Sequence, residues 1–147
     1  MTHSFLVESG SWQLQGVWIE RDRQPKPVQG MTIIAWTQAD WFTMVTKLVF
    51  PQEERPEISF QYRGRLDLQR QQYTFVLRQT ILGKIEGEGW LASQSIIQRY
   101  WVLGDGQRRS GFDTFYQLDQ DSYHLSSAIL TGHYLTSAME ARLNRKG

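Results

Sequence analysis

The chain has 147 residues, a formal net charge of +1 and no cysteine. The near-zero charge gives no bulk electrostatic reason to expect nucleic-acid or anionic-membrane binding, and the lack of cysteine excludes disulfides, thiolate zinc sites and cysteine nucleophiles. The length fits a single domain over residues 1–147, with a core of its own. No apolar run approaches the roughly 18 residues of a membrane span, and residues 1–9 lack the basic segment of a signal peptide. We therefore expect a soluble, cytoplasmic protein.

Strand-like segments follow one another along the whole chain. The clearest alternation runs through Ile58, Phe60, Tyr62 and Leu66, with polar residues between them. This period of two, broken by Gly- and Asp-containing turns, predicts strands near 11–21, 30–38, 41–50, 57–67, 72–82, 85–91, 95–103, 109–118, 122–130 and 133–144. Two segments also have a spacing that a helix could use, namely 96–101 and the end of the chain from Met139 onward.

About ten short-linked strands predict an all-β fold. An open sheet of that size would leave long aromatic edges exposed to other chains, whereas a closed barrel has no edges. We therefore predict a single antiparallel up-and-down β-barrel of about ten strands, with a flattened sandwich as the alternative.

Aromatic residues make up 13% of the chain, and six of them are tryptophans. Trp18, Trp36, Trp41, Trp90 and Trp101 fall on five different predicted strands. Such dispersal favours a lined pocket over a plain core, because ligand pockets are built mainly from apolar and aromatic side chains. Trp18, Trp36 and Trp101 are the candidate ligand contacts.

Arg99 is a candidate partner for an acidic ligand. It shares a strand face with Ile97 and Trp101. If that face is interior, its guanidinium needs an anionic partner, which could be a ligand carboxylate or an internal Asp67 or Glu86.

Arg108 and Arg109 form a second basic candidate, directly after a predicted turn. An arginine fork matches a carboxylate with two hydrogen bonds, so the pair could hold an acidic ligand. The alternative is an ordinary solvated face.

The sequence shows no self-contained catalytic machinery. It has no Gly-x-Ser-x-Gly elbow, no zinc motif, and no triad context for any of its three histidines. Gly83, Gly87 and Gly89 resemble a phosphate loop only faintly, because the closing Gly-Lys-Ser/Thr is missing. Bulges or tight strand crossings are the simpler interpretation of these glycines.

The first predicted strand opens Gly10-Ser11-Trp12 and continues to Gly16. This opening resembles the calycin barrels, which include the lipocalins and fatty-acid-binding proteins. The resemblance implies that Trp12 plugs one end of the barrel and that a late arginine, Arg142 or Arg145, stacks on its indole.

Gln98-Arg99-Tyr100-Trp101-Val102, continued to Arg108, resembles a hairpin of the S-type phycobiliprotein chromophore lyases. The stretch from Tyr134 to Leu143 is similar to the closing strand of that family. The resemblance implies a bilin ligand that is delivered to a cysteine of a phycobiliprotein subunit. The chain departs from the family at Gln98, where the family has an acidic residue.

Gly10, Trp12 and Gly16 are also similar to the opening of nitrobindin, as is the run His133-Tyr134-Leu135-Thr136-Ser137-Ala138 to its last strand. This resemblance implies a haem cofactor with His133 as axial ligand. Strict alternation would place His133 on one face with Leu135, Met139 and Leu143. An ordinary hydrogen-bonded strand histidine is the alternative.

Three hypotheses follow. The leading one is a small-ligand barrel that binds a bilin and serves as a chromophore-binding chaperone or lyase, without spanning a membrane. The second is a haem-binding barrel, and the third is an assembly or interaction protein without a small-molecule ligand. An interior packed solid with side chains, with no cavity of a few hundred Å³, would favour the third hypothesis over both ligand hypotheses.

Overall fold

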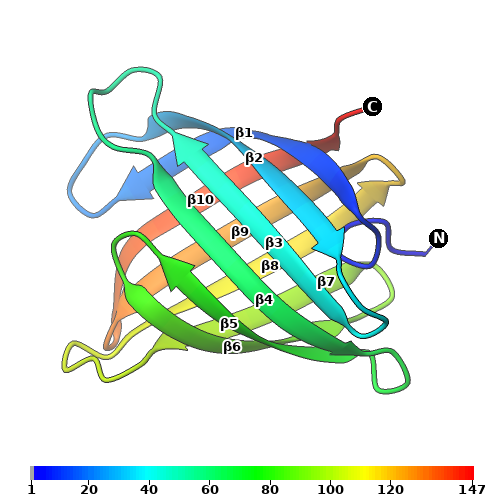
Figure 1. The fold of residues 1–147 in the computed structure, drawn as a ribbon. Coiled ribbons are helices and arrows are strands. Elements are labelled where there is room, and N and C mark those ends of the chain that lie inside the picture. Colours follow the sequence, from blue (N-terminus) through cyan, green and yellow to red (C-terminus); the bar gives the residue numbers. More distant parts are fainter. Residues whose placement is uncertain (1) are drawn as a thin grey trace.

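The computed structural model describes residues 2–147, which form ten antiparallel strands closed into a barrel (Figure 1). Each strand pairs with the next along the chain, and β10 pairs with β1. The strands are β1 Gly10–Glu20, β2 Lys26–Trp36, β3 Trp41–Val49, β4 Ile58–Asp67, β5 Gln72–Gln79, β6 Gly83–Leu91, β7 Ser95–Val102, β8 Arg109–Asp119, β9 Ser122–Thr131 and β10 Tyr134–Arg145.

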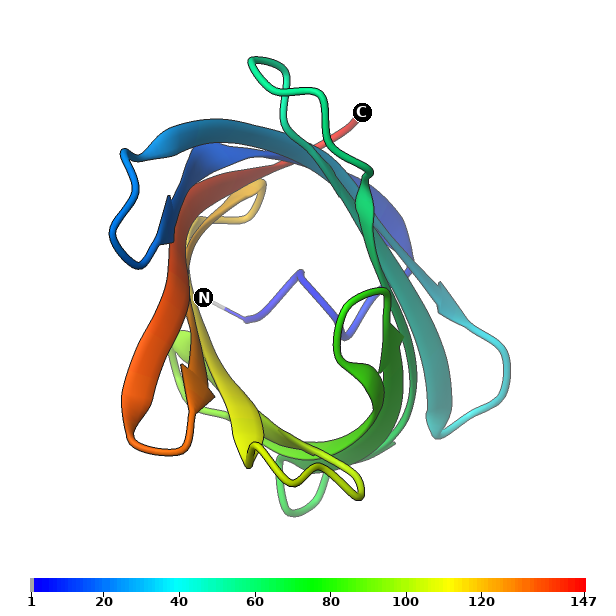
Figure 2. The ribbon, with the colours of Figure 1, turned by 90° about the vertical axis from the view of Figure 1, so that its left-hand side faces the viewer.

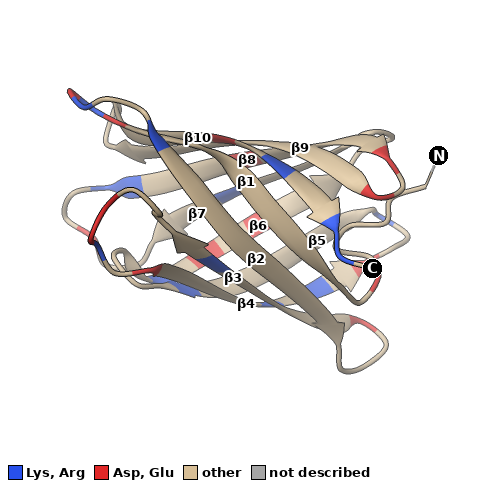
Figure 3. Ribbon diagram, turned by 90° about the horizontal axis from the view of Figure 1, so that it is seen from above, with Lys and Arg blue, Asp and Glu red and all other residues tan. Residues whose placement is uncertain are grey.

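The predicted all-β barrel is confirmed, and the flattened sandwich is excluded by the closed strand order. The two helix-like segments are strands: residues 96–101 lie in β7, and the end of the chain continues β10 to Arg145. The described residues contain no helix that could cross a membrane. The positions of Lys and Arg and those of Asp and Glu are interspersed along the strands and turns (Figure 3).

Alternation decides which side chains face inward. In β4, Ile58, Phe60, Tyr62 and Leu66 are buried, and the arginines between them are exposed. Successive side chains of a strand point to opposite faces, so one face of each strand builds the core and the other meets water. Large apolar side chains on the inner faces exclude water, which is the main favourable term in folding.

Several inward-facing positions are glycines that lie beneath aromatic rings. A Cβ at Gly89 would lie 2.2 Å from the Tyr73 ring, and one at Gly87 would lie 2.2 Å from the Phe75 ring. The pairing of β5 with β6 is regular there, so these glycines make room for rings and do not mark bulges. The same arrangement recurs where Phe42 covers Gly64 and Tyr100 covers Gly111.

One end of the barrel is closed by the N-terminal segment. Figure 2 shows this segment crossing the far end of the barrel. Phe5 and Trp12 are buried there and pack edge to face, with ring centroids 5.4 Å apart. The Arg145 guanidinium lies 5.0 Å from the centroid of the Trp12 ring. The predicted Trp12 plug is confirmed, and its cation is Arg145.

The opposite rim carries the β3–β4 connection, residues 50–57, which is the longest turn of the barrel. Arg55 donates to Glu20 at 2.7 Å and to Glu53 at 3.1 Å, which ties this connection to the end of β1. The Arg55 guanidinium also lies 4.0 Å from the centroid of the Phe50 ring. Phe50 in turn packs edge to face against Trp18, with ring centroids 5.6 Å apart. The contact of Phe50 with Trp18 therefore connects the β3–β4 connection at this rim to the side chains of the barrel interior.

Candidate functional site

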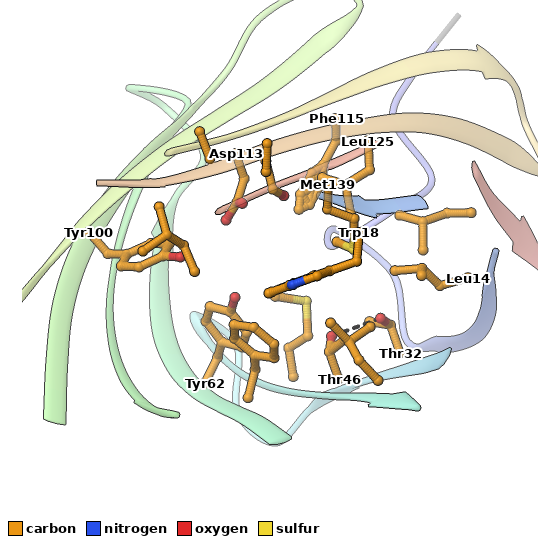
Figure 4. Close-up of a pocket in the computed structure, with 18 of the residues that line it drawn as sticks. Leu14, Trp18, Thr32, Thr46, Tyr62, Tyr100, Asp113, Phe115, Leu125 and Met139 are labelled. Carbon is orange, nitrogen blue, oxygen red and sulfur yellow. Dashed lines mark hydrogen bonds between the residues drawn. The ribbon is translucent and has the colours of Figure 1, made fainter. Parts of the chain in front are cut away.

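The interior of the barrel contains an apolar cavity (Figure 4). The empty space among its lining atoms, including the part that opens to solvent, is about 580 Å³. The centre of a water molecule can reach only about 50 Å³ of that space. The volume of about 50 Å³ is the one that limits what can bind. The lumen is therefore a narrow space between side chains that would hold a few waters. The interior is not packed solid, but this volume is smaller than the few hundred Å³ expected of a ligand pocket.

The cavity exists because its walls differ in side-chain size. The β9 and β10 wall contributes small residues, including Ser127 and Ser137. The facing wall contributes Phe60 and Tyr62 of β4, and Trp18 of β1, the neighbour of β10, extends into the same space. Small residues on one side leave a space that the opposite rings do not reach. On β9 and β10 several of these inner residues are only half-buried, which marks the mouth of the lumen. The cavity-lining residues with polar side-chain atoms include Trp18, Thr32, Thr46, Tyr62, Tyr100, Asp113 and Ser127.

Asp113 of β8 is the acidic group of the cavity. Its carboxylate accepts a hydrogen bond from the Gln98 side-chain amide at 2.7 Å, and Gln98 accepts one from the Tyr73 hydroxyl at 2.7 Å. Burial raises the pKa of Asp113, although hydrogen bonds from Ser127 and Gln98 oppose the shift. The described residues that line the cavity include no Lys, Arg or His, so no protein cation compensates this carboxyl.

Two further polar features face the cavity. The Thr32 and Thr46 hydroxyls are hydrogen-bonded to each other at 2.8 Å and so satisfy one another. The Trp18 indole N–H, in contrast, finds no hydrogen-bond partner among the described residues although the side chain is buried. Burial also raises the pKa values of the Tyr62 and Tyr100 hydroxyls well above their usual range, so both stay neutral.

Of the predicted tryptophan contacts, Trp18 lines the cavity and two others lie elsewhere. Trp36 lies at the closed end, where its indole N–H donates to the Leu6 carbonyl at 2.9 Å. Trp101 is half-buried on the outer face of β7. The argument from dispersed tryptophans was wrong as a guide to the pocket, since Trp90 is 60% exposed on the outer wall.

The face of β7 that carries Arg99 is exterior. Arg99 is exposed, and its guanidinium lies 5.8 Å from the centroid of the Trp101 ring. The inner face carries Ile96, Gln98 and Tyr100 instead, all of them buried. Arg99 therefore does not face the barrel interior and needs no anionic partner there.

The two rim arginines differ in their contacts. Arg109 donates from Nε to Asp105 Oδ2 at 2.8 Å, and this guanidinium holds the pKa of Asp105 below its usual value. Arg108 lies in the turn between β7 and β8 with a φ of 54°, is exposed, and has no ion pair among the described residues. Of the two arginines, Arg108 is the one whose guanidinium has no ion pair among the described residues, so it could meet an anion at the rim.

His133 lies in the turn between β9 and β10 and is exposed. The pairing of these strands shifts register between Leu135 and Ser137, so the alternation breaks there. Leu135 consequently faces outward, whereas Met139 and Leu143 face inward. The prediction that His133 shares their face was wrong, and a haem held by this histidine would sit at the rim.

Sequence reasoning missed Asp113 as a site residue. The signal was present, because Gly111, Asp113 and Phe115 alternate with outward residues along the predicted strand 109–118. An acid on an otherwise apolar face marks a buried polar group. No cluster of three metal-ligating side chains occurs among the residues that the structure describes.

Comparison with solved structures places this fold among known barrels. The crystal structure of Rv2717c from M. tuberculosis superposes with a TM-score of 0.73, at 14% identity, over 95% of this chain and 92% of that chain. The S-type phycobiliprotein lyase CPES from Guillardia theta gives a TM-score of 0.67, at 16% identity, over 95% of this chain and 89% of that one. The chain shares the barrel fold of these two structures. At these identities the likeness concerns the fold alone.

The sequence comparisons give no relative. No family model matches the chain, and no curated protein matches it.

Proposed function

We propose that this barrel binds a tetrapyrrole of the bilin type and acts as a chromophore-binding chaperone or lyase for a phycobiliprotein subunit. The observation that carries the proposal is Asp113, a buried carboxyl that faces an aromatic lumen without a cation to balance it. A bilin offers pyrrole N–H groups to such a carboxyl, and its flat rings suit the space between aromatic side chains.

The proposed ligand also has two propionates, which must stay near water. Arg108 lies at the rim with no partner of its own and would pair with one of them. In this arrangement Asp113 stands on the strand next to Gln98 and accepts a hydrogen bond from it. The acidic group that the lyase resemblance leads one to expect at position 98 is thus supplied one strand away.

Binding a tetrapyrrole requires the lumen to widen, because its usable room is about 50 Å³. Trp18 lies across the cavity (Figure 4) and contacts Phe50 at the rim, so these two rings are the ones that would move. Their displacement would join the cavity to the mouth on the β9–β10 side.

The fold shared with an S-type phycobiliprotein lyase supports the proposed partner. The chain has no cysteine of its own, so in the proposed role the covalent bond would form on the phycobiliprotein. The barrel would contribute orientation, while the reactive groups belong to chromophore and acceptor. We place this activity in the cytoplasm.

The test is a titration of the purified protein with phycocyanobilin, followed by visible absorption. We expect a shifted and narrowed band, and a weaker effect in Asp113→Leu, which removes the carboxyl. An unchanged spectrum at micromolar protein would overturn the proposal. Transfer is then measured by adding a cysteine-bearing phycobiliprotein subunit and counting the bilin that stays attached after denaturation.

A role as an interaction protein is the second candidate, and the outer wall of β6–β8 favours it. Trp90 is 60% exposed, Phe112 45% and Tyr116 43% on that wall. Exposed aromatic side chains in one region are typical of protein contacts. In this role, replacing Trp90 and Phe112 by serine should weaken binding of the protein partner whether or not a bilin is present. Loss of a partner without any bilin binding by the parent protein would favour this second candidate.

A further inference from the structure

Two polar groups that face the lumen, the Trp18 indole N–H and the Asp113 carboxyl, could form hydrogen bonds with a ligand. Trp18 is 6% exposed, and its indole N–H has no partner among the described residues. Figure 4 shows its ring lying across the cavity with the nitrogen toward the empty space. A buried donor without an acceptor is costly, because it has lost its hydrogen bond to water. A ligand with an acceptor at this point would remove that cost.

Asp113 faces the same cavity from β8, which only β10 and β9 separate from β1 in the barrel (Figure 4). The direction of its hydrogen bonds is fixed by the neighbouring chain of donors. The Tyr73 hydroxyl donates to the Gln98 carbonyl oxygen, which leaves the Gln98 amide N–H to donate to Asp113. Asp113 is therefore an acceptor, and each carboxylate oxygen can accept a further hydrogen bond.

The lumen thus presents one donor without an acceptor and one acceptor with spare capacity. An anionic head group would satisfy Trp18 but would meet the carboxyl of Asp113 without a cation nearby. A simple amine would satisfy Asp113 and leave the Trp18 N–H unpaired. A cyclic amide offers both a carbonyl oxygen and an N–H on one edge of a flat ring.

We infer that the lumen recognises the lactam edge of a planar ligand, with Trp18 donating to the carbonyl oxygen and Asp113 accepting the N–H. This inference deepens the proposed function and rests on it for biological meaning, because the end rings of a bilin are lactams. Its chemistry can be tested without a bilin. Trp18 and Asp113 are then the residues that determine specificity.

The experiment compares three small bicyclic probes by calorimetry. The first, 2-quinolinone, carries the complete lactam edge. N-methyl-2-quinolinone lacks the donor, and indole lacks the carbonyl oxygen. We expect the complete lactam to bind at least about tenfold more tightly than either, the effect of one hydrogen bond. Equal affinities of the three probes in the parent protein, or no binding of any of them, would overturn the inference.

Variants assign the preference to the two residues. Asp113→Asn should bring the affinity ratio of 2-quinolinone to its N-methyl derivative toward one. Trp18→Phe should do the same for the ratio of 2-quinolinone to indole. Ratios are used because any general loosening of the lumen affects both probes alike, and the parent protein alone still tests the inference if a variant fails to fold.

Trp41→Phe and Asp67→Asn, which change outer-surface and turn residues, are the matched controls and should leave both ratios unchanged. Ratios that stay unchanged in Asp113→Asn and Trp18→Phe would contradict the assignment. A bilin spectrum without a lactam preference refutes only this inference, whereas a lactam preference without bilin binding refutes only the proposed function.

Discussion

Gln98 and Asp113 lie directly opposite each other on β7 and β8, and the Gln98 amide donates to the Asp113 carboxylate at 2.7 Å. Both side chains are buried. The pair fixes an acid within an apolar interior, where a carboxyl remains only if hydrogen bonds replace its contact with water. This relationship has consequences for stability as well as for ligand binding.

Stability should fall as the pH rises through the titration of Asp113. Burial raises its folded-state pKa above the usual 3.8, so the folded protein holds this proton at pH values where the unfolded chain has released it. The folded state is then favoured at low pH, and that contribution is lost between pH 3.8 and the higher folded-state pKa. Thermal melting of the parent protein and Asp113→Asn across this range would measure the effect. As the pH rises, the melting temperature of Asp113→Asn should increase relative to that of the parent protein. A difference between the two melting temperatures that does not change with pH would contradict the prediction.

Gly89→Ala should destabilise the barrel. The new Cβ would lie 2.2 Å from the Tyr73 ring, so the ring must leave the wall or the strand must shift. We expect a loss of about 1–3 kcal/mol in the free energy of unfolding, as for other overpacked cores. Chemical denaturation measures this loss. Gly106→Ala is the control, because a Cβ at Gly106 meets nothing within 4 Å, and equal stability of the two variants would refute the role of the glycine.

Trp12→Ala should open the closed end of the barrel. The indole is 1% exposed and lies between Phe5, Tyr123 and the Arg145 guanidinium. Removing it should cost about 3–5 kcal/mol in the free energy of unfolding, the usual range for a large buried aromatic residue. Arg145→Gln, which keeps the indole but removes the cation and its surface ion pairs with Glu8 and Asp121, should cost about 1 kcal/mol or less. Urea denaturation of both variants would show the difference, and similar losses would contradict this division.

Arg108 and His133 should differ in their effects on tetrapyrrole binding. Arg108 is an unpaired cation at the rim, so Arg108→Ala should weaken bilin binding by about tenfold, with less dependence on salt. Arg108→Lys keeps the charge and should lose less. His133 lies in a turn outside the lumen, so any shift in the absorption of added haemin should survive His133→Ala. Absorption titrations test both, and loss of the haemin signal in His133→Ala would restore this histidine as an axial ligand.

The strand pattern was predictable from the sequence because alternation and turn residues are local signals. The inner face of a strand is a different question, since it depends on partners far along the chain. Ile97 and Trp101 made one face of β7 look interior, whereas Gln98 and Tyr100 occupy the true interior. At the start of β10, the register shift after Leu135 reversed the alternation, and no local residue pattern announces such a shift.

Because one end of the barrel is closed, the parts of a ligand must enter and leave the lumen in a fixed order. Because the N-terminal segment blocks one end, any molecule must come and go through the same mouth. The part that goes in first comes out last, so the two ends of a long guest can never exchange places without complete release. If a chromophore is transferred from this barrel to an acceptor, only the ring nearest the mouth could react while the rest stays bound. The orientation in which the chromophore entered would then determine which ring reacts.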